Sequence, residues 1–402
     1  MAKNTPRKPG RHFLQIPGPT PVPDRILHAI AKPTIDHRGP EFQSLAKRLL
    51  EDVKTVFKTD QQVFIFPSSG TGAWEAALTN TLSPGDKILM FETGQFATLW
   101  YKMALKFGLD AEFISSDWRI GADADQIGAR LAEDKNHEIK AVCVCQSETS
   151  TGCISLIEDI RRAMDAANHP AMLMVDTISS LASMDYRHDD WGVDVCVGGS
   201  QKGFMLPPGL SFTAVSAKAL AATKTAKLPR AFWDWHDMAT PNANGFFPYT
   251  PATNLLYGLA EAIDMLHEEG LDNVFARHAR HAEASRTAVR AWGLEVLCRD
   301  PKYYSPTVTA VLMPEGYNAD EFRLTALDTF DISFGTGLNK VAGKIFRIGH
   351  LGDTNDLTII GALSAVEMTL EITGVPHQKG GVQAAMGYLA SAAHVPSRMA
   401  AE

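Results

Sequence analysis

The 402-residue chain has few cysteines, no long apolar run and no excess of positive charge. Its five cysteines are an odd number and contain no Cys-x-x-Cys pair, so neither a disulfide framework nor a zinc site is expected, and we interpret all five as reduced thiols in or near the core. No apolar run approaches about 18 residues, which excludes a membrane-spanning helix. With 38 basic and 46 acidic residues, the net charge of −8 does not support binding to nucleic acid or to an anionic membrane.

A secretory signal and a nucleotide-binding loop are also missing. Residues 1–12 are basic but have no apolar segment, so we expect a cytoplasmic protein. Gly70 and Gly72 supply two glycines of a dinucleotide-binding fingerprint, but Glu75 stands where the third glycine is required. No Lys-Ser or Lys-Thr pair directly follows these glycines, as a P-loop would require. A nucleotide-dependent dehydrogenase is therefore disfavoured.

The composition and the pattern of apolar runs indicate a two-domain α/β enzyme. An apolar fraction of 45% and a charged fraction of 21% are ordinary for a globular enzyme, and the length suffices for two cores. Short apolar runs alternate with helix-forming segments between residues 63 and 215, which is typical of a mostly parallel sheet covered on both faces. The seven expected strands are residues 63–66, 87–91, 111–115, 139–145, 171–175, 193–197 and 211–215.

The rest of the chain divides into an arm and a smaller domain. Residues 1–22 are rich in Pro, Lys and Arg and predict an extended N-terminal arm, after which a large domain should occupy residues 23–290. From about residue 294 strands and helices alternate on a smaller scale, which predicts a small α+β domain over residues 291–402. Residues 228–250 form an irregular stretch dense in aromatic side chains, which suggests a subunit interface.

One lysine stands where a solvated surface lysine would be out of place. Residues 193–197 form an apolar run that predicts a buried strand, and the turn formers Gly198, Gly199 and Ser200 follow it directly. Lys202 comes next, at the edge of the sheet where α/β proteins bind ligands. An amine held there loses water, its charged form is disfavoured, and it becomes a candidate Schiff-base nucleophile. Taken alone, a lysine is far more often an ordinary surface residue, and it is the neighbouring motifs that single out Lys202.

A carboxylate follows another apolar run of the same predicted sheet. Residues 171–175 lead into Asp176, and a polar loop comes after it. An aspartate in this position is often only a helix cap or a turn former. Paired with Lys202, it fits the chemistry of pyridoxal phosphate, which needs a lysine for its aldehyde and an acid that keeps its ring nitrogen protonated.

The third element is a small-residue turn that opens a helix. The strand ending at residue 66 runs into Gly70, Thr71 and Gly72, which begin a helix-forming segment. Backbone amides at a helix N-terminus can bind phosphate, and glycine lets the phosphate approach closely. Alone, this pattern is also that of an ordinary helix start.

These three elements, together with the motifs SQK at residues 200–202 and RIGHLG at residues 347–352, resemble the class V, fold type I pyridoxal-phosphate aminotransferases. The stretches LTNTLSPGD (78–86) and GLNKVAGK (337–344) are similar to the serine–glyoxylate enzymes, a group that overlaps the alanine–glyoxylate aminotransferases. The resemblance covers about residues 14–374 and is therefore specific.

The resemblance implies pyridoxal 5'-phosphate as the cofactor and no metal. It implies that Lys202 and Asp176 are the catalytic residues. Phe96 would stack on the pyridine ring and Thr149 would bond to the ring oxygen or the phosphate side, although core packing and a helix cap are the alternatives. The expected cofactor contacts are Gly70, Thr71, Gly72, Phe96, Thr149, Asp176, Ile178, Gln201, Lys202, Tyr249 and Thr250.

The resemblance also implies substrate contacts and a homodimer. Arg347 ends a short apolar run, and its guanidinium fork would clamp the substrate carboxylate, with a structural salt bridge as the alternative. Thr250 would cross to the partner's cofactor phosphate, and Tyr249 is a candidate helper there. The expected substrate contacts are Gly18, His37, Arg38, Thr149 and Arg347, of which His37 and Arg38 would reach the neighbouring subunit's site.

The reaction that the resemblance implies uses small amino-acid and 2-oxo-acid substrates. L-Serine and glyoxylate would give 3-hydroxypyruvate and glycine by a ping-pong mechanism through a Lys202 Schiff base. An alanine–glyoxylate aminotransferase, or another class V enzyme with a different amino donor, is the alternative. A binding module without catalysis is also open, and it would show no half-reaction with serine.

Overall fold

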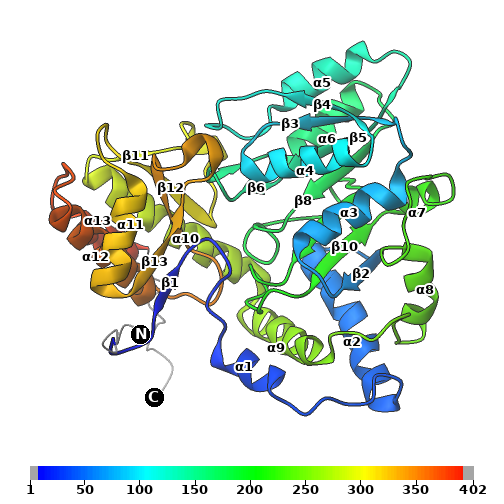
Figure 1. The fold of residues 1–402 in the computed structure, drawn as a ribbon, viewed down its shortest axis with the longest axis horizontal. Helices are drawn as coiled ribbons and strands as arrows, with labels where there is room; N and C mark the ends of the chain where they lie inside the picture. Colours follow the sequence, from blue (N-terminus) through cyan, green and yellow to red (C-terminus); the bar gives the residue numbers. More distant parts are fainter. Residues whose placement is uncertain (1–7, 393–402) are drawn as a thin grey trace, which may run out of the picture.

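The computed structural model describes residues 8–392, so the first seven residues of the predicted arm and the last ten residues of the chain lie outside it. Two main sheets are present, a larger one in the blue-to-green part of the chain and a smaller one toward the C-terminus (Figure 1). No helix in the described part of the chain is long and apolar enough to cross a bilayer. All five cysteines are buried as free thiols, as the sequence predicts.

The larger sheet has seven strands, and its architecture confirms the predicted α/β fold with a mostly parallel sheet. Strand β10 runs antiparallel to both of its neighbours, and every other pair in the sheet is parallel. All seven expected strands form, within two residues of the predicted bounds. Their spatial order is β2 (Gln62–Phe66), β10 (Ser211–Val215), β9 (Val195–Gly199), β8 (Met172–Asp176), β5 (Ile139–Cys145), β3 (Lys87–Phe91) and β4 (Asp110–Ile114).

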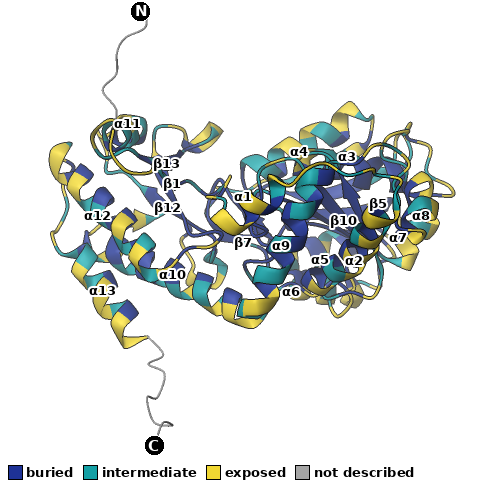
Figure 2. Ribbon diagram, turned by 90° about the horizontal axis from the view of Figure 1, so that it is seen from below, coloured by how far each residue is buried: buried dark blue, intermediate teal, exposed yellow. Residues whose placement is uncertain are grey.

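Helices bury both faces of this sheet, which explains why its strands are mostly apolar, with the partly exposed edge strand β4 as the exception. In β2, Val63 and Ile65 pack into one core, whereas Phe64 and Phe66 pack into the other. Figure 2 shows the strands buried and the exposed residues on the outer sides of the helices. The covering helices are α2 (Pro40–Phe57), α3 (Gly70–Thr81), α4 (Gln95–Lys106), α5 (Ala124–Glu133), α6 (Ile157–Ala166), α7 (Ala217–Ala222), α8 (Trp235–Ala243) and α9 (Thr253–Glu269).

Strand β9 extends two residues beyond its predicted end. Gly198 and Gly199, expected as a turn, instead pair with Phe212 and Ser211 of β10. A Cβ on Gly198 would lie 2.8 Å from the end of the Leu181 side chain, so glycine is favoured here by close packing and not by a turn. The chain therefore leaves the sheet only after Gly199, directly before Lys202.

The prediction of an irregular stretch over residues 228–250 is wrong for its middle part, because α8 forms there. The Asp234 side chain caps this helix by accepting a hydrogen bond from the His236 backbone N–H at 2.8 Å. Trp235 is fully buried, with its ring stacked on Phe64 at 5.8 Å. The aromatic residues that suggested an exposed surface thus serve partly to dock this helix on the sheet.

The smaller sheet has five strands and includes part of the predicted arm. Strand β1 (Phe13–Gln15) pairs in parallel with β13 (Ile332–Thr336), more than 300 residues later in the chain. The order continues through β14 (Ile345–Gly349), β12 (Val308–Leu312) and β11 (Glu295–Val296). The helices that share its core are α10 (Leu271–Ala291), α11 (Ala319–Phe330), α12 (Asp356–Ile372) and α13 (Gly381–Ser391). The domain boundaries at residues 22 and 290 stay a proposal, since β1 and the end of α10 both contribute to the smaller part.

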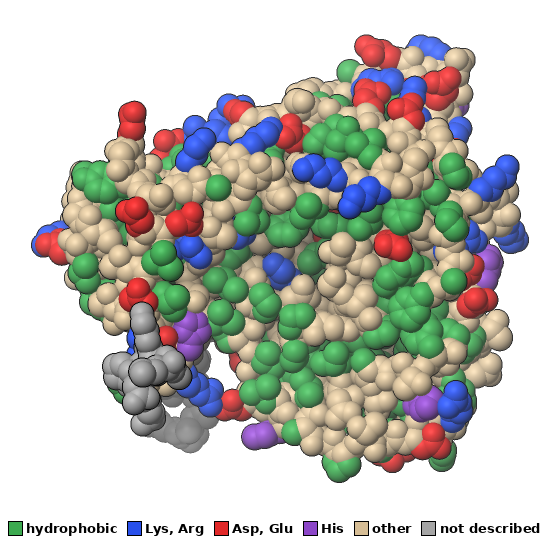
Figure 3. Space-filling view, viewed as in Figure 1, with side chains coloured by type: hydrophobic (Ala, Val, Ile, Leu, Met, Phe, Trp, Pro, Cys, Tyr) green, Lys and Arg blue, Asp and Glu red, His purple; other side chains and the backbone are tan. Residues whose placement is uncertain are grey.

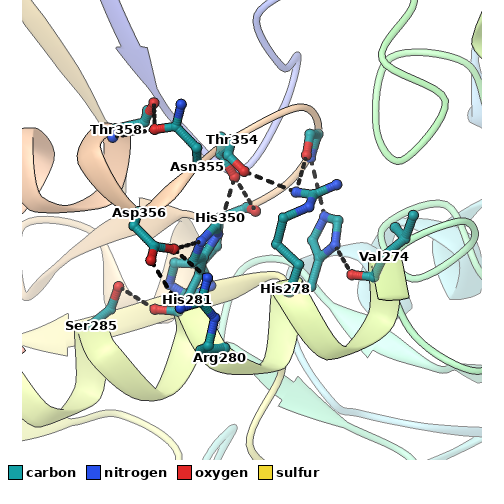
Figure 4. Close-up of polar contacts among 12 residues, drawn as sticks. Val274, His278, Arg280, His281, Ser285, His350, Thr354, Asn355, Asp356 and Thr358 are labelled. Atoms are coloured by element: carbon teal, nitrogen blue, oxygen red, sulfur yellow. Dashed lines mark hydrogen bonds and ion pairs between the residues drawn. The ribbon is translucent and has the colours of Figure 1, made fainter. Parts of the chain in front are cut away.

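A cluster of buried histidines joins α10 to the loop after β14 (Figure 4). His278 donates from Nδ1 to the carbonyl oxygen of Val274 at 2.7 Å, and its Nε2 accepts from the backbone N–H of Gly352 at 3.3 Å. His281 bonds through Nε2 to a carboxylate oxygen of Asp356 at 3.0 Å. Because Nε2 of His278 acts as an acceptor, this ring must stay neutral for the loop to keep its position.

Acid is therefore expected to destabilise the fold through these rings. Burial lowers the pKa of His278 to about 3 from an ordinary value of 6.5, and it lowers the pKa of His188, a buried ring outside this cluster that contacts Tyr186, to about 4. Below pH 6.5 the unfolded chain then binds more protons than the folded one, so stability falls with pH toward the folded values. Each such ring costs about 1.4 kcal/mol per pH unit in that window. Urea unfolding of His278→Asn between about pH 6.5 and pH 4.5 should show a shallower loss of unfolding free energy than the unchanged protein.

The comparison of slopes isolates His278 from other titrating groups. Asp176, whose pKa is raised, contributes a slope of the opposite sign that cancels between variants. His28→Asn, at an exposed position, should keep the slope of the unchanged protein. Equal slopes for all three proteins would contradict the prediction.

Candidate active site

One cavity of about 200 Å³ lies at the carboxyl ends of β8 and β9, where α/β sheets bind ligands. Asp176 is the last residue of β8, and Lys202 follows β9 after a short turn. The cavity also collects side chains from the start of α3, the start of α4 and the N-terminal segment. Its lining residues are Gly18, Pro19, Ser69, Gly70, Thr71, Trp74, Phe96, Ser147, Thr149, Asp176, Ile178, Ser179, Gln201 and Lys202.

Lys202 is a buried amine, with 7% of its surface exposed. Its Nζ donates a hydrogen bond to the carbonyl oxygen of Pro17 at 2.6 Å. Desolvation lowers the pKa of Lys202 to about 7, and the positive charge of Arg347 adds to this effect. A large share of the amine is therefore neutral near pH 7, which is the state that can act as a nucleophile or a base.

Asp176 is a buried carboxylate held by three donors. Its Oδ1 accepts from the backbone N–H of Ile178 at 2.7 Å. Its Oδ2 accepts from Nε1 of Trp74 at 3.1 Å and from the Cys145 thiol at 3.6 Å. Burial raises the pKa of Asp176 to about 7 against the effect of these hydrogen bonds.

The first turn of α3 offers backbone amides to the cavity. Its N-cap residue, Ser69, makes no side-chain hydrogen bond to the helix, and both Gly70 and Thr71 line the cavity. A Cβ on Gly70 would lie 2.2 Å from the end of the Ile178 side chain, so a larger residue here would require that side chain to move. Such a turn fits a phosphate group. Gly72 is not among the lining residues of the described chain.

Phe96 lines the cavity from the first turn of α4, and a buried glutamate holds this turn in place. Glu148, which is fully buried, accepts hydrogen bonds from the backbone N–H groups of Phe96 at 3.2 Å and Ala97 at 3.1 Å. It also accepts from the Ser150 hydroxyl at 2.6 Å. Glu148 thus fixes the direction of Phe96 and the loop that carries Thr149.

Arg347 stands on the smaller sheet, beside the cavity and not among its lining residues. Nε donates to the carbonyl oxygen of Thr336 at 2.8 Å, and Nη1 donates to the carbonyl oxygen of Thr149 at 2.8 Å. Burial lowers the pKa of Arg347 to about 10, so it stays charged. Within residues 8–392 its Nη2 has no hydrogen-bond acceptor. The structural salt bridge that the sequence left open does not form in this part of the chain; backbone carbonyls hold the guanidinium instead.

The N-terminal segment crosses between the two sheets and approaches Lys202 closely. Gly18 has a φ of +109°, and a Cβ on it would lie 2.5 Å from the Lys202 side chain. The backbone N–H of Thr20 donates to the carbonyl oxygen of Gln201 at 3.1 Å. A Cβ on Gly349 would lie 2.2 Å from the carbonyl oxygen of Ile16. The segment is thus tied to β14 on one side and to the Lys202 turn on the other.

Some predicted site residues line the cavity, and others lie outside it. His37 and Arg38 form a partly exposed pair before α2, with 2.7 Å between Nη1 and Nε2. Tyr249 stacks on Phe232 at 4.5 Å, and Thr250 is exposed. None of the predicted residues His37, Arg38, Tyr249 and Thr250 lines the described cavity of its own chain, which leaves their proposed role at a partner's site untested.

Trp74, Ser147 and Ser179 line the cavity although the sequence did not single them out. Ser179 contacts Thr149 through a hydroxyl–hydroxyl hydrogen bond. Trp74 could have been found from helix spacing, because it follows Gly70 by four residues and so faces the same side of α3.

The cavity has the chemical groups that pyridoxal phosphate requires. A buried amine of low pKa suits its aldehyde, an acceptor carboxylate suits its ring nitrogen, and an uncapped helix N-terminus suits its phosphate. These three groups all line one cavity, so the residues fit the cofactor.

Comparisons with known proteins also indicate an aminotransferase. Residues 12–345 match the family model described as aminotransferase class-V. The chain is 52% identical over 379 residues to a serine–glyoxylate aminotransferase of Hyphomicrobium methylovorum, covering 93% of this chain and 94% of the relative. It is 50% identical to an L-aspartate–glyoxylate aminotransferase of Paracoccus denitrificans, covering 92% and 94%. The solved pyridoxamine–pyruvate aminotransferase of Mesorhizobium loti superposes with a TM-score of 0.88 at 28% identity, covering 95% of this chain and 97% of that chain.

Proposed function

This chain belongs to the class V aminotransferases, and we propose that it transfers the amino group of L-serine to glyoxylate, giving 3-hydroxypyruvate and glycine. Its two sheets form the fold type I architecture of these enzymes. The observation that carries the proposal is the buried Lys202 amine, which shares one cavity with Asp176 and lies close enough to Arg347 to be influenced by its charge. Two relatives are named a serine–glyoxylate and an L-aspartate–glyoxylate aminotransferase, and the acceptor common to both names supports glyoxylate as the amino acceptor here.

Pyridoxal 5'-phosphate is the cofactor, and when bound it supplies an aldehyde for amines and a ring that takes up negative charge. We propose that Lys202 holds the aldehyde and that the first turn of α3, at Gly70 and Thr71, holds the phosphate. Asp176 would accept the ring N–H, and Phe96 would cover one face of the ring. Their places on the cavity wall support these roles.

Lys202 has the properties of the group that moves the proton. Once the substrate's amine has taken its place, Nζ can accept the proton from the α-carbon and return it. The Pro17 carbonyl oxygen, 2.6 Å from Nζ, provides an acceptor that orients the free amine. The neutral state favoured by burial makes the amine a base near neutral pH.

Arg347 is the proposed clamp for the substrate carboxylate. A guanidinium binds a carboxylate through two parallel hydrogen bonds, and its Nη2 is not used within the described chain. The two backbone carbonyls that bind Nε and Nη1 fix its plane.

We also propose a homodimer in which Thr250, His37 and Arg38 reach the partner's site, with Tyr249 as a further candidate. Phe232 is 44% exposed beside Tyr249, which supports a covered surface there. Figure 3 shows hydrophobic side chains gathered over the part of the molecule that holds the larger sheet. A cytoplasmic location stays a prediction of the sequence.

A spectral titration of the purified protein tests the reaction. Added L-serine should remove the visible absorption of the bound cofactor, and glyoxylate should restore it while 3-hydroxypyruvate and glycine accumulate. L-Alanine and L-aspartate are tested in the same titration as alternative amino donors. Conversion by either of these but not by L-serine would favour the alternative, a class V aminotransferase with another donor. No conversion by any amino acid would reject transamination.

A further inference from the structure

We infer that Trp74 is a positioning residue, whose indole N–H keeps the Asp176 carboxylate ionised and directed into the cavity. The inference rests on the proposed function only in one respect, namely that a cofactor ring nitrogen is the group that Asp176 meets. The contact itself is independent of any bound group.

The hydrogen bonds around Asp176 leave a single acceptor position for a ligand. An ionised carboxylate has roughly four lone-pair positions. Trp74 and Cys145 occupy two on Oδ2, at 3.1 Å and 3.6 Å, and Ile178 occupies one on Oδ1, at 2.7 Å. Since Asp176 lines the cavity, the remaining position is available to one N–H donor there.

Trp74 differs from Cys145, the other side chain bonded to Asp176, because its indole N–H can only donate a hydrogen bond. A thiol such as that of Cys145 can turn and accept a hydrogen bond, but an indole nitrogen has no lone pair to offer. A protonated Asp176 would therefore lose the Trp74 bond to Oδ2 or would have to place its own proton on Oδ1. Burial and the negative charge of Glu148 act in the other direction, because both favour the neutral acid, whereas a protonated Lys202 favours the ionised one.

The indole is held so firmly that its direction is fixed. Trp74 is 2% exposed and stacks on Trp100 with ring centroids 6.0 Å apart and an angle of 13°. Trp100 belongs to α4, is fully buried, and its Nε1 has no hydrogen-bond partner within residues 8–392. The two rings thus form one stack, in which only Trp74 bonds to the carboxylate.

The consequence concerns where one proton resides. While Asp176 is ionised, a ring nitrogen beside it keeps its proton and the ring can take up negative charge. If Asp176 takes the proton instead, the ring nitrogen becomes neutral and that ability is lost. Trp74 biases this choice through its hydrogen bond to Asp176.

The test compares Trp74→Phe with Trp100→Phe, which removes an indole from the same stack but no bond to Asp176. In the loaded enzyme, 15N-labelled cofactor should lose its ring-nitrogen proton at lower pH in Trp74→Phe than in the other two proteins. In cofactor-free full-length protein with 13C-labelled aspartate, Asp176 should bind its proton about tenfold more tightly in Trp74→Phe. Asp176→Asn identifies its signal.

A tryptophan analogue provides a second test in case the phenylalanine variant does not fold. Placing β-(3-benzothienyl)alanine at position 74 keeps the shape of tryptophan but replaces the N–H by sulfur, and the same tighter proton binding is expected. Unchanged titration of Asp176 in the analogue protein would overturn the inference. The cofactor-free titration needs no substrate, so a protein that shows the Asp176 difference but no half-reaction with serine would reject the proposed function and support the role of Trp74.

Discussion

Lys202→Ala is expected to lower kcat/KM for amino transfer by at least about 10⁴-fold, because the variant loses the amine that we propose both to hold the aldehyde and to move the α-proton. The visible absorption of the bound cofactor should change with it, since that absorption depends on the bond between the aldehyde and the lysine. Absorption spectra of the purified variant and initial rates with L-serine and glyoxylate provide the two measurements.

Two controls separate loss of the amine from loss of the fold. Lys224→Ala removes a lysine from an exposed position and should leave both the spectrum and the rate unchanged. Lys202→Arg keeps a cation in the cavity but cannot form the bond, so it should be as inactive as the alanine variant. A visible band that persists in Lys202→Ala would refute the proposed attachment of the cofactor.

Lys202 and Asp176 could be located from the sequence because each comes at the end of a continuous apolar run. Such runs predict strands that are buried on both faces, and the carboxyl ends of parallel strands meet at one edge of the sheet. The argument needs only local pattern and a general rule of topology. For this reason the seven strands also matched their expected ranges closely.

Other features depend on contacts between distant segments, and local pattern does not reveal them. The pairing of β1 with β13 joins residues more than 300 positions apart, so a three-residue strand in a Pro-rich arm has no signature of its own. Glu148 belongs to a polar stretch of the sequence and resembles a solvated residue, yet it forms part of a two-residue strand and is fully buried against the start of α4. Trp74 reads as an ordinary core residue of an apolar helix.

Arg347 shows how the two kinds of information combine. Its position at the end of an apolar run predicted a charge in need of a partner. Only the folded chain shows that the partners are the carbonyl oxygens of Thr149 and Thr336, one from each sheet region. The guanidinium therefore connects the loop that lines the cavity to the smaller sheet.

Replacing this guanidinium is expected to weaken substrate binding and to spare cofactor binding. Arg347→Lys keeps the charge but loses the planar fork, and kcat/KM for L-serine should fall about 10²-fold, mostly through KM. For Arg347→Ala, kcat/KM should fall about 10³-fold, because both hydrogen bonds that we propose to reach the carboxylate are lost together with the charge. Initial rates over a range of serine concentrations measure the fall, and the visible spectrum reports retained cofactor.

Arg323 provides the matched control for this arginine. It is also partly buried in the smaller part of the molecule, and its Nε donates to the carbonyl oxygen of Phe334 at 2.9 Å. Unlike Arg347, which donates to the lining residue Thr149, it makes no hydrogen bond to a residue of the cavity wall within the described chain. Arg323→Lys should leave KM for L-serine unchanged, because a change of packing near β13 alone is not expected to weaken serine binding. Two results together would contradict the clamp: release of the cofactor from Arg347→Lys, and an unaltered KM for serine in the fraction that retains the cofactor. They would show that Arg347 supports cofactor binding and does not bind the substrate carboxylate.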